Sequence, residues 1–153
     1  MPKIYDLFRE RVAAKAPMGL YDTLGFTLDH FEPGAARVSV EIHPGLHNFQ
    51  GTLHGGVYCD IADMAMGIAF FCSLEEGEAM TTLELKINYL RPVSEGRVTA
   101  EAKVINKGRT TGLIECDVRD AQGRLLARSS STCYIFRGDK AQTSHAKMSD
   151  WKR

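Results

Sequence analysis

The sequence predicts an α+β fold in which six antiparallel strands curl around one long helix. Three observations lead to this prediction: the order of the apolar segments, the strongly apolar composition of the longest helical segment, and the short turns between the strand segments. The order is a helix, two strands, a long helix and then four strands. Because the long helix is apolar on nearly all sides, other elements must cover most of it. Strands joined by short turns pair antiparallel, and six of them can provide that cover.

The first elements follow from local patterns. An amphipathic helix is expected over residues 3–16, because apolar residues recur there at helical spacing. Two strands are expected over 25–31 and 36–42, where apolar and polar residues alternate around the turn at 32–35. Residues 43–53 are rich in glycine and proline, and we expect them to form a loop.

The second half is expected to contain the long helix, over residues 54–73, and four strands. These strands are expected at 79–90, 97–107, 110–120 and 124–136. We expect the final strands to leave an exposed sheet edge that a second subunit covers. The predicted organisation is therefore an N-terminal helix (1–18), one main domain (19–137) and a polar, poorly ordered tail (138–153).

Composition narrows the classes of function. The chain of 153 residues has the length of one domain, and its 19 basic and 19 acidic residues give no net charge. It therefore gives no indication of nucleic acid or an anionic membrane as a partner. The most apolar run, 57–72, contains two aspartates and is too short to span a bilayer. The four cysteines have no C-x-x-C spacing, so we expect reduced core thiols and a cytoplasmic location.

The candidate catalytic groups lie in the segment 48–63, which reads NFQGTLHGGVYCDIAD. His54 precedes two glycines, Gly55 and Gly56, at the expected start of the long helix. No side chain covers their backbone N–H groups, and the helix dipole favours a developing negative charge at this end. Asp63 follows as a carboxylate among apolar residues. An oxyanion donor and a carboxylate are the two parts needed to add water to an acyl group.

Helix geometry separates these two parts. The nine-residue step from His54 to Asp63 corresponds to about 180° around the helix and roughly 13 Å along it. They therefore cannot reach one small reacting group from the same helix. Two antiparallel copies of the helix across a two-fold axis would solve this, which predicts a homodimer with two shared sites. Each residue also has a structural interpretation, as a cap, a close-packing glycine or a core hydrogen-bonding group, and Asp60 is expected to be structural.

A metal site is not expected. His43 and His47 would form a ligand pair on a helix, but Pro44 and Gly45 lie between them and indicate a loop. We also expect no cofactor, because the backbone N–H groups at the helix start can fill the oxyanion role that a metal would have.

The string GTLHGG, the step from His54 to Asp63 and the later TTLELKINYLRPV together resemble the hotdog-fold acyl-CoA thioesterases of the PaaI type. The similarity runs from about Gly19 to Phe136. The resemblance implies a curved antiparallel sheet around a long central helix and pairs of subunits that form two composite sites. It also implies hydrolysis of an acyl-CoA thioester to the free acid and CoA.

The same resemblance implies a role for individual residues. Gly55 would donate its N–H to the thioester carbonyl oxygen, with Asn48 assisting. Asp63, from the other subunit, would activate water as a general base or attack as a nucleophile. Thr82 would help to hold that water, and His54 would orient the thioester. The residues implied to contact CoA, where basic side chains would meet phosphates, are Gly56, Arg91, Pro92, Lys107, Gly108, Arg109 and Thr110.

Several questions stay open at the level of sequence. A hydratase or dehydratase of the same fold would need a histidine and an acid that converge on the substrate Cα and Cβ. A non-catalytic acyl-CoA sensor would be expected to carry a DNA-binding extension, for which this sequence shows no segment. The acyl group could be aryl or medium-chain, and dimers could pair further into a homotetramer. The residues expected to form an apolar pocket are Tyr58, Met64, Met66, Phe70 and Phe71.

Overall fold

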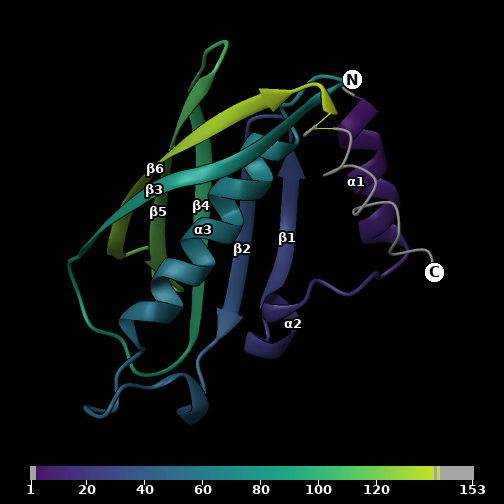
Figure 1. Cartoon of the computed structure of the whole chain (residues 1–153). Helices are drawn as coiled ribbons and strands as arrows, with labels where there is room; N and C mark the ends of the chain where they lie inside the picture. The colour runs from purple at the N-terminus through teal and green to yellow at the C-terminus, as the bar shows by residue number, and fades with distance from the viewer. Residues whose placement is uncertain (1–2, 140, 142–153) are drawn as a thin grey trace.

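The computed structural model describes residues 3–139 and 141, and its elements follow the expected order (Figure 1). In chain order the elements are α1 (Lys3–Ala13), α2 (Leu20–Leu24), β1 (Thr27–Glu32), β2 (Ala35–Glu41), the 3-10 helix η1 (Pro44–Leu46), α3 (Gly55–Phe71), β3 (Glu78–Tyr89), β4 (Arg97–Lys107), β5 (Thr111–Asp120) and β6 (Leu125–Arg137). The strands and α3 begin and end within two residues of the expected positions, whereas α1 ends earlier and α2 and η1 were not expected. Most of the polar tail, including His145 and Trp151, lies outside the described residues.

All six strands form one antiparallel sheet in the order β1-β2-β4-β5-β6-β3, which confirms the expected fold class. The expected position of the exposed edge is wrong. The last strand, β6, pairs with β5 on one side and with β3 on the other. The reason is that α3 carries the chain from β2 across the sheet, so that β3 joins at the opposite end. Within the described residues, β1 and β3 are therefore the edge strands.

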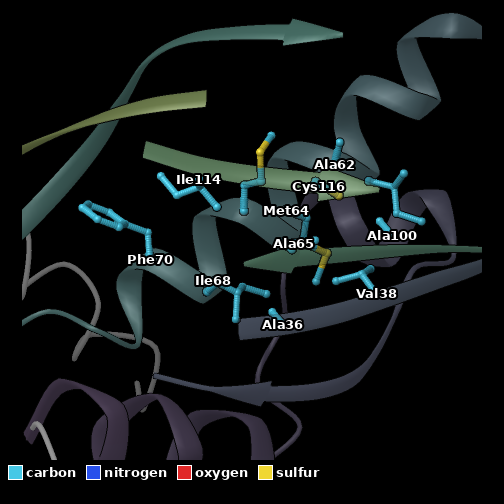
Figure 2. Close-up of a cluster of buried hydrophobic side chains, with 14 of the residues drawn as sticks. Ala36, Val38, Ala62, Met64, Ala65, Ile68, Phe70, Ala100, Ile114 and Cys116 are labelled. Carbon is cyan, nitrogen blue, oxygen red and sulfur yellow. The ribbon is translucent and has the colours of Figure 1, made fainter. Parts of the chain in front are cut away.

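The central helix α3 lies across the sheet, which curves around it (Figure 1). Figure 2 shows its side chains packed with those of β2, β4 and β5, and most of them are fully buried. A Cβ atom at Gly112 of β5 would lie only 2.1 Å from the ring of Phe70, so the absence of a side chain there lets the ring pack on the strand. Although α3 is strongly apolar, no helix among the described residues is long and apolar enough to cross a membrane.

The two N-terminal helices lie at the β1 end of the sheet. Figure 1 shows α1 beside β1, and Phe8 of α1 packs edge-on against Phe31 of β1, with the ring centroids 5.2 Å apart. Phe8 also meets Phe71 at the end of α3, at 5.8 Å. The short α2 ends at Gly25, whose φ of +73° favours glycine. Because this turn takes up residues that were expected to be extended, β1 begins only at Thr27.

The cysteines form no disulfide in the structure. All four are free thiols, and Cys72, Cys116 and Cys133 are buried as expected. Burial raises the pKa of Cys72 and of Cys116 to about 12, so these thiols stay protonated at neutral pH. Cys59 differs because it is only half-buried, near the start of α3.

Candidate active site

Asp63 lies near the middle of α3 and is half-buried rather than enclosed in the core. The Thr82 hydroxyl of β3 donates a hydrogen bond to its Oδ1 at 3.3 Å. A β-bulge between Thr82 and Glu84 interrupts β3 at this point, and such irregularities re-aim neighbouring side chains. Burial raises the pKa of Asp63, the Thr82 hydrogen bond lowers it, and the negative charge of Asp60 raises it. The net rise makes this carboxylate a stronger base than one in water.

Asp63 and Thr82 open onto a cleft of about 730 Å³. The rest of its lining is mostly apolar and comes from α1, the segment 17–19, α2, α3 and β3. Its apolar side chains include Phe8, Met18, Met64, Ile68, Phe71 and Met80. The cleft is thus an apolar space with the Asp63 carboxylate in its wall, and the N-terminal helices form part of its boundary.

Only part of the expected apolar pocket faces this cleft. Met64 and Phe71 line it, because seven residues complete two helical turns and leave both side chains on one face of α3. Met66 and Phe70 are fully buried on other faces of the helix, and Tyr58 is buried near its start. For these three residues the expected contact with the pocket is wrong, since they fill the core instead.

Tyr21 of α2 is a polar group of the cleft that sequence reasoning missed. Its ring lines the cleft together with Asp63 and is half-buried. Burial raises its pKa, and the charges of Asp63 and then Asp60 raise it further, so the phenol stands within electrostatic range of both carboxylates. No motif in the sequence links Tyr21 to α3, because the contact depends on a short helix that lacks a periodic apolar pattern.

The start of α3 forms the second group of candidate residues. His54 is the N-cap, and its Nδ1 accepts a hydrogen bond from the Gly56 N–H at 2.8 Å. Within the described residues, the Gly55 N–H donates to no other group of the chain. Among the described residues, the free donor at the positive end of the helix is therefore the Gly55 N–H, whereas the Gly56 N–H is bonded to His54.

Tyr89, the last residue of β3, contacts this helix start. Its hydroxyl donates to the Gly55 carbonyl oxygen at 2.9 Å. A Cβ atom at Gly55 would lie 3.2 Å from the same hydroxyl oxygen, so the close approach favours glycine at this position. In the sequence, Tyr89 stands in the stretch TTLELKINYLRPV, and no role was predicted for it. The signal in the sequence that could have indicated Tyr89 was a tyrosine hydroxyl at the end of a predicted strand.

Asn48 lies in the loop that precedes α3, and its side chain is engaged there. Its Nδ2 donates to the Thr52 hydroxyl at 3.0 Å, and its Oδ1 accepts from the backbone N–H of Gln50 at 2.9 Å. These bonds form a local turn of the kind that asparagine favours. To assist at the thioester, the Asn48 amide would have to break its hydrogen bond to the Thr52 hydroxyl and donate to the substrate instead.

One chain does not bring the two groups together. Gly55 and Asp63 are eight residues apart on a continuous helix, which corresponds to about 12 Å along its axis. The structure places Asp63 beside Thr82 and the apolar cleft, and Gly55 beside His54 and Tyr89.

The residues expected to contact CoA fall into two places. Arg91 and Pro92 lie near the start of β4, and Arg91 donates to the Leu125 carbonyl oxygen at 2.7 Å. The turn 107–110 follows the other end of the 11-residue strand, about 33 Å away at 3.3 Å per residue. There the Lys107 ammonium is paired with Glu78 at 2.7 Å, whereas the Arg109 side chain is exposed.

The histidines that precede the site take part in hydrogen bonds to the backbone. His43 caps η1 by accepting the Gly45 N–H at 3.2 Å, and His47 Nε2 lies 2.9 Å from the Ser94 carbonyl oxygen. Among residues 3–139 and 141, no group of three or more His, Cys, Asp or Glu side chains is arranged to hold a metal ion.

Comparisons with known proteins agree with this geometry. Residues 50–127 match the family model described as the thioesterase superfamily. The 1,4-dihydroxy-2-naphthoyl-CoA hydrolase of Listeria monocytogenes is 36% identical over 118 residues, which cover 77% of this chain and 96% of that protein.

Solved structures of similar proteins cover the same region. A thioesterase from Haemophilus influenzae has a TM-score of 0.77 at 28% identity, covering 84% of this chain and 90% of its own. A point mutant of the phenylacetic acid degradation protein PaaI from Thermus thermophilus has a TM-score of 0.70 at 28% identity, and the match covers 75% of this chain and 96% of that one. The chain therefore belongs to the thioesterase superfamily and has its hotdog fold, and this membership supports thioester hydrolysis as its chemistry.

Proposed function

We propose that the protein hydrolyses an acyl-CoA thioester to the free acid and CoA. The observation that carries this proposal is the placement of Asp63, whose raised pKa and contact with Thr82 put a basic carboxylate in the wall of an apolar cleft. The unengaged Gly55 N–H at the start of α3 supplies the matching oxyanion donor. The similarity to the naphthoyl-CoA hydrolase of Listeria monocytogenes supports CoA as the group that carries the acyl chain.

The reaction follows from these two groups. Water held by Asp63 and Thr82 adds to the thioester carbonyl carbon, and Asp63 takes the proton that the water loses. The negative charge that develops on the carbonyl oxygen is stabilised by the Gly55 N–H and the helix dipole. The carbonyl then reforms, the C–S bond breaks, and CoA leaves as a thiolate that takes up a proton.

A nucleophilic route uses the same residues differently. Asp63 would attack the thioester carbon, release CoA and form a mixed anhydride, which water would then hydrolyse. A single turnover in water enriched in heavy oxygen tests for the nucleophilic route. Label in the Asp63 carboxylate would show an anhydride that water attacks at the Asp63 carbonyl, whereas label in the released acid fits both a general base and an anhydride that water attacks at the acyl carbonyl.

We propose that each site is shared between two subunits of a homodimer. The 12-residue edge strand β3 is suited to pairing with its copy, because an edge presents unpaired backbone groups. Two large apolar side chains of β3 are well exposed in the single chain, Leu83 at 60% and Tyr89 at 53%. Phe49, next to Asn48, is 98% exposed, which favours a partner surface near the start of α3.

A further association into a dimer of dimers is proposed on the same grounds. Ile105 of β4 and Leu113 of β5 are exposed apolar residues on neighbouring strands. An apolar area on the outside of the sheet is suited to packing against a second dimer. Sedimentation of the wild-type protein would show a tetramer, and polar substitutions at these two positions should reduce it to an active dimer.

We propose an aryl or medium-chain acyl group as the substrate. The cleft of about 730 Å³ lies within the range of sites that enclose small molecules, and its lining includes aromatic and methionine side chains. Such residues accept both flat rings and short alkyl chains.

The CoA end is proposed to lie on both subunits. Arg91 and the exposed Arg109 are the basic residues of the two expected segments that could meet phosphates. Because the segments lie at opposite ends of β4, a CoA that contacts both would use Arg91 of one subunit and the turn 107–110 of the other.

The proposed cellular location and partners follow from the free thiols and the net charge. Four free thiols suit a reducing compartment, so we propose a cytoplasmic enzyme. Its equal numbers of basic and acidic residues give no reason to propose nucleic acid or a membrane as a partner.

A panel of acyl-CoA substrates, assayed for release of the free CoA thiol, tests the function. We expect release with aryl and medium-chain acyl groups and its loss in Asp63→Asn. Formation of a hydrated acyl-CoA instead of free CoA would show a hydratase, and tight binding without turnover would show a sensor.

Mixing two inactive variants tests the shared site. After subunit exchange, Asn48→Ala and Asp63→Asn subunits should form mixed dimers with one intact site of two. An equal mixture should therefore recover about a quarter of the wild-type sites. If verified mixed dimers show no recovery, each site belongs to a single chain.

A further inference from the structure

The peptide unit between Gly55 and Gly56 is held at both of its ends. Its carbonyl oxygen accepts a hydrogen bond from the Tyr89 hydroxyl at 2.9 Å, and its N–H donates to His54 Nδ1 at 2.8 Å. The first group reaches it from the end of β3, and the second from the residue that caps α3. This peptide unit therefore cannot rotate without breaking a bond to one of two side chains.

The preceding peptide unit is held by the helix itself. The His54 carbonyl oxygen accepts from the backbone N–H of Val57 at 3.0 Å and of Tyr58 at 3.3 Å. Its other end is the Gly55 N–H, which is unengaged within the described residues. Both peptide units that flank the Gly55 Cα atom are thus held, and the free Gly55 N–H, which belongs to the first of them, keeps a defined direction.

Tyr89 is in turn held in place by its neighbours. Its hydroxyl oxygen lies 3.2 Å from Cys59 Sγ, and its ring packs edge-on against the Tyr58 ring at 5.7 Å. Since the Tyr89 proton is directed to the Gly55 carbonyl, the Cys59 thiol is the donor to the Tyr89 oxygen. The side chain that contacts the glycines is therefore oriented from two sides.

A pair of glycines needs such support. Glycine has access to more backbone conformations than any other residue, so a Gly-Gly helix start is locally the least restricted one. An oxyanion donor contributes most when its direction is set before the charge develops. Residues that restrict the two glycines therefore act on the transition state rather than on binding of the ground state.

We propose that Tyr89 is a positioning residue that orients the Gly55 N–H by holding the Gly55 carbonyl from the end of β3. This inference rests on the thioester hydrolysis proposed above, in which the Gly55 N–H stabilises the oxyanion. Tyr89 itself needs no contact with the substrate for this role.

The kinetic test is Tyr89→Phe, which keeps the ring and removes the hydroxyl. Direct loss of an oxyanion donor typically costs 10²–10³-fold in kcat, and loosening one should cost less, about 10-fold, with KM changed by less than about two-fold. The matched control is Tyr134→Phe, which removes the hydroxyl of another exposed tyrosine, on β6, and should leave both constants unchanged. An unchanged kcat in Tyr89→Phe, or an increase in KM alone, would overturn the proposal.

An NMR measurement tests the same contact without any enzymatic activity. In Tyr89→Phe the amide signals of Gly55 and Gly56 should shift, and these amides should exchange faster with solvent than in the wild type, while Tyr134→Phe leaves them in place. If wild-type protein hydrolyses no thioester but the amides respond, the proposed function fails and the contact stands. If the amides do not respond, Tyr89 does not hold the helix start.

Discussion

The two halves of the candidate site lie in opposite environments on one helix. Asp63 is half-buried, faces an apolar cleft and receives one hydrogen bond, from Thr82. Gly55 lies at the accessible helix start, where His54 and Tyr89 hold the neighbouring peptide unit. The basicity of Asp63 depends on its removal from water, whereas the direction of the Gly55 N–H depends on backbone geometry.

The difference indicates why the two halves are kept apart. A carboxylate becomes a better base when burial raises its pKa, but a buried helix start would have to satisfy every N–H and would leave none for the substrate. The separation of about 12 Å along the helix allows Asp63 to be half-buried while the helix start at Gly55 stays accessible. In the proposed homodimer, association of two subunits would bring the halves together, and the substrate would contact both.

Removal of the carboxylate should have the largest effect. Asp63→Asn keeps the size of the side chain but abolishes the base, so we expect kcat to fall about 10²–10⁴-fold while KM changes little. Steady-state CoA release measures both constants. Retention of more than about a third of the wild-type kcat would mean that Asp63 is not the catalytic carboxylate.

The control for this change is Asp60→Asn, one helical turn earlier. Asp60 is not among the residues that line the cleft, and its charge raises the pKa of Asp63, so its loss should be much milder at the optimal pH. Equal losses at both positions would show that the wrong carboxylate is assigned to the site.

The fold could be predicted from sequence because its signals are local. The apolar run that forms α3 and the turn residues between strands set the boundaries to within two residues. The sheet order could not be predicted, since it depends on where α3 returns the chain, and no residue of β3 marks it as an edge. The cover of the cleft by α1 and α2 was also missed, as these helices contact α3 only through folded geometry.

The site was partly predictable for the same reason. The helix start and the two aspartates lie in one continuous segment, so their spacing gives their geometry directly. Contacts between segments were harder to foresee. Thr82 was identified only through the resemblance to a family, and the links from Tyr89 to Gly55 and from Tyr21 to Asp63 join residues more than thirty positions apart.

A side chain at Gly67 should change the acyl specificity. Gly67 lies one turn after Asp63 in the cleft wall, and a Cβ atom there would meet nothing within 4 Å. Gly67→Leu should therefore fold, fill the cleft and lower kcat/KM for aryl and medium-chain substrates about 10–200-fold, with acetyl-CoA much less affected. Gly67→Ala is the graded control and should show a smaller loss. Equal losses for all chain lengths would place the acyl group elsewhere.

Smaller shifts are expected in the pH dependence of kcat/KM, because activity requires ionised Asp63 and is lost as the pH falls through its pKa. Burial raises this pKa, the Thr82 hydrogen bond lowers it and the Asp60 charge raises it. Thr82→Val should therefore move the acidic limb of the profile to higher pH, and Asp60→Asn should move it to lower pH. Shifts in the same direction, or no shift in either variant, would contradict the assignment of the limb to Asp63.

Treatment with EDTA should have no effect at all. The oxyanion role that a metal ion would fill is assigned to the Gly55 N–H, and His54 uses its Nδ1 to cap α3. His43 accepts from the Gly45 N–H and His47 contacts the Ser94 carbonyl oxygen. The short 3-10 helix η1 lies between them rather than an α-helix, so their spacing does not make them an α-helical ligand pair. We expect the rate of CoA release to be the same before and after chelation. Activity that disappears with EDTA and returns with zinc would overturn the mechanism and make these three histidines the first candidates for ligands.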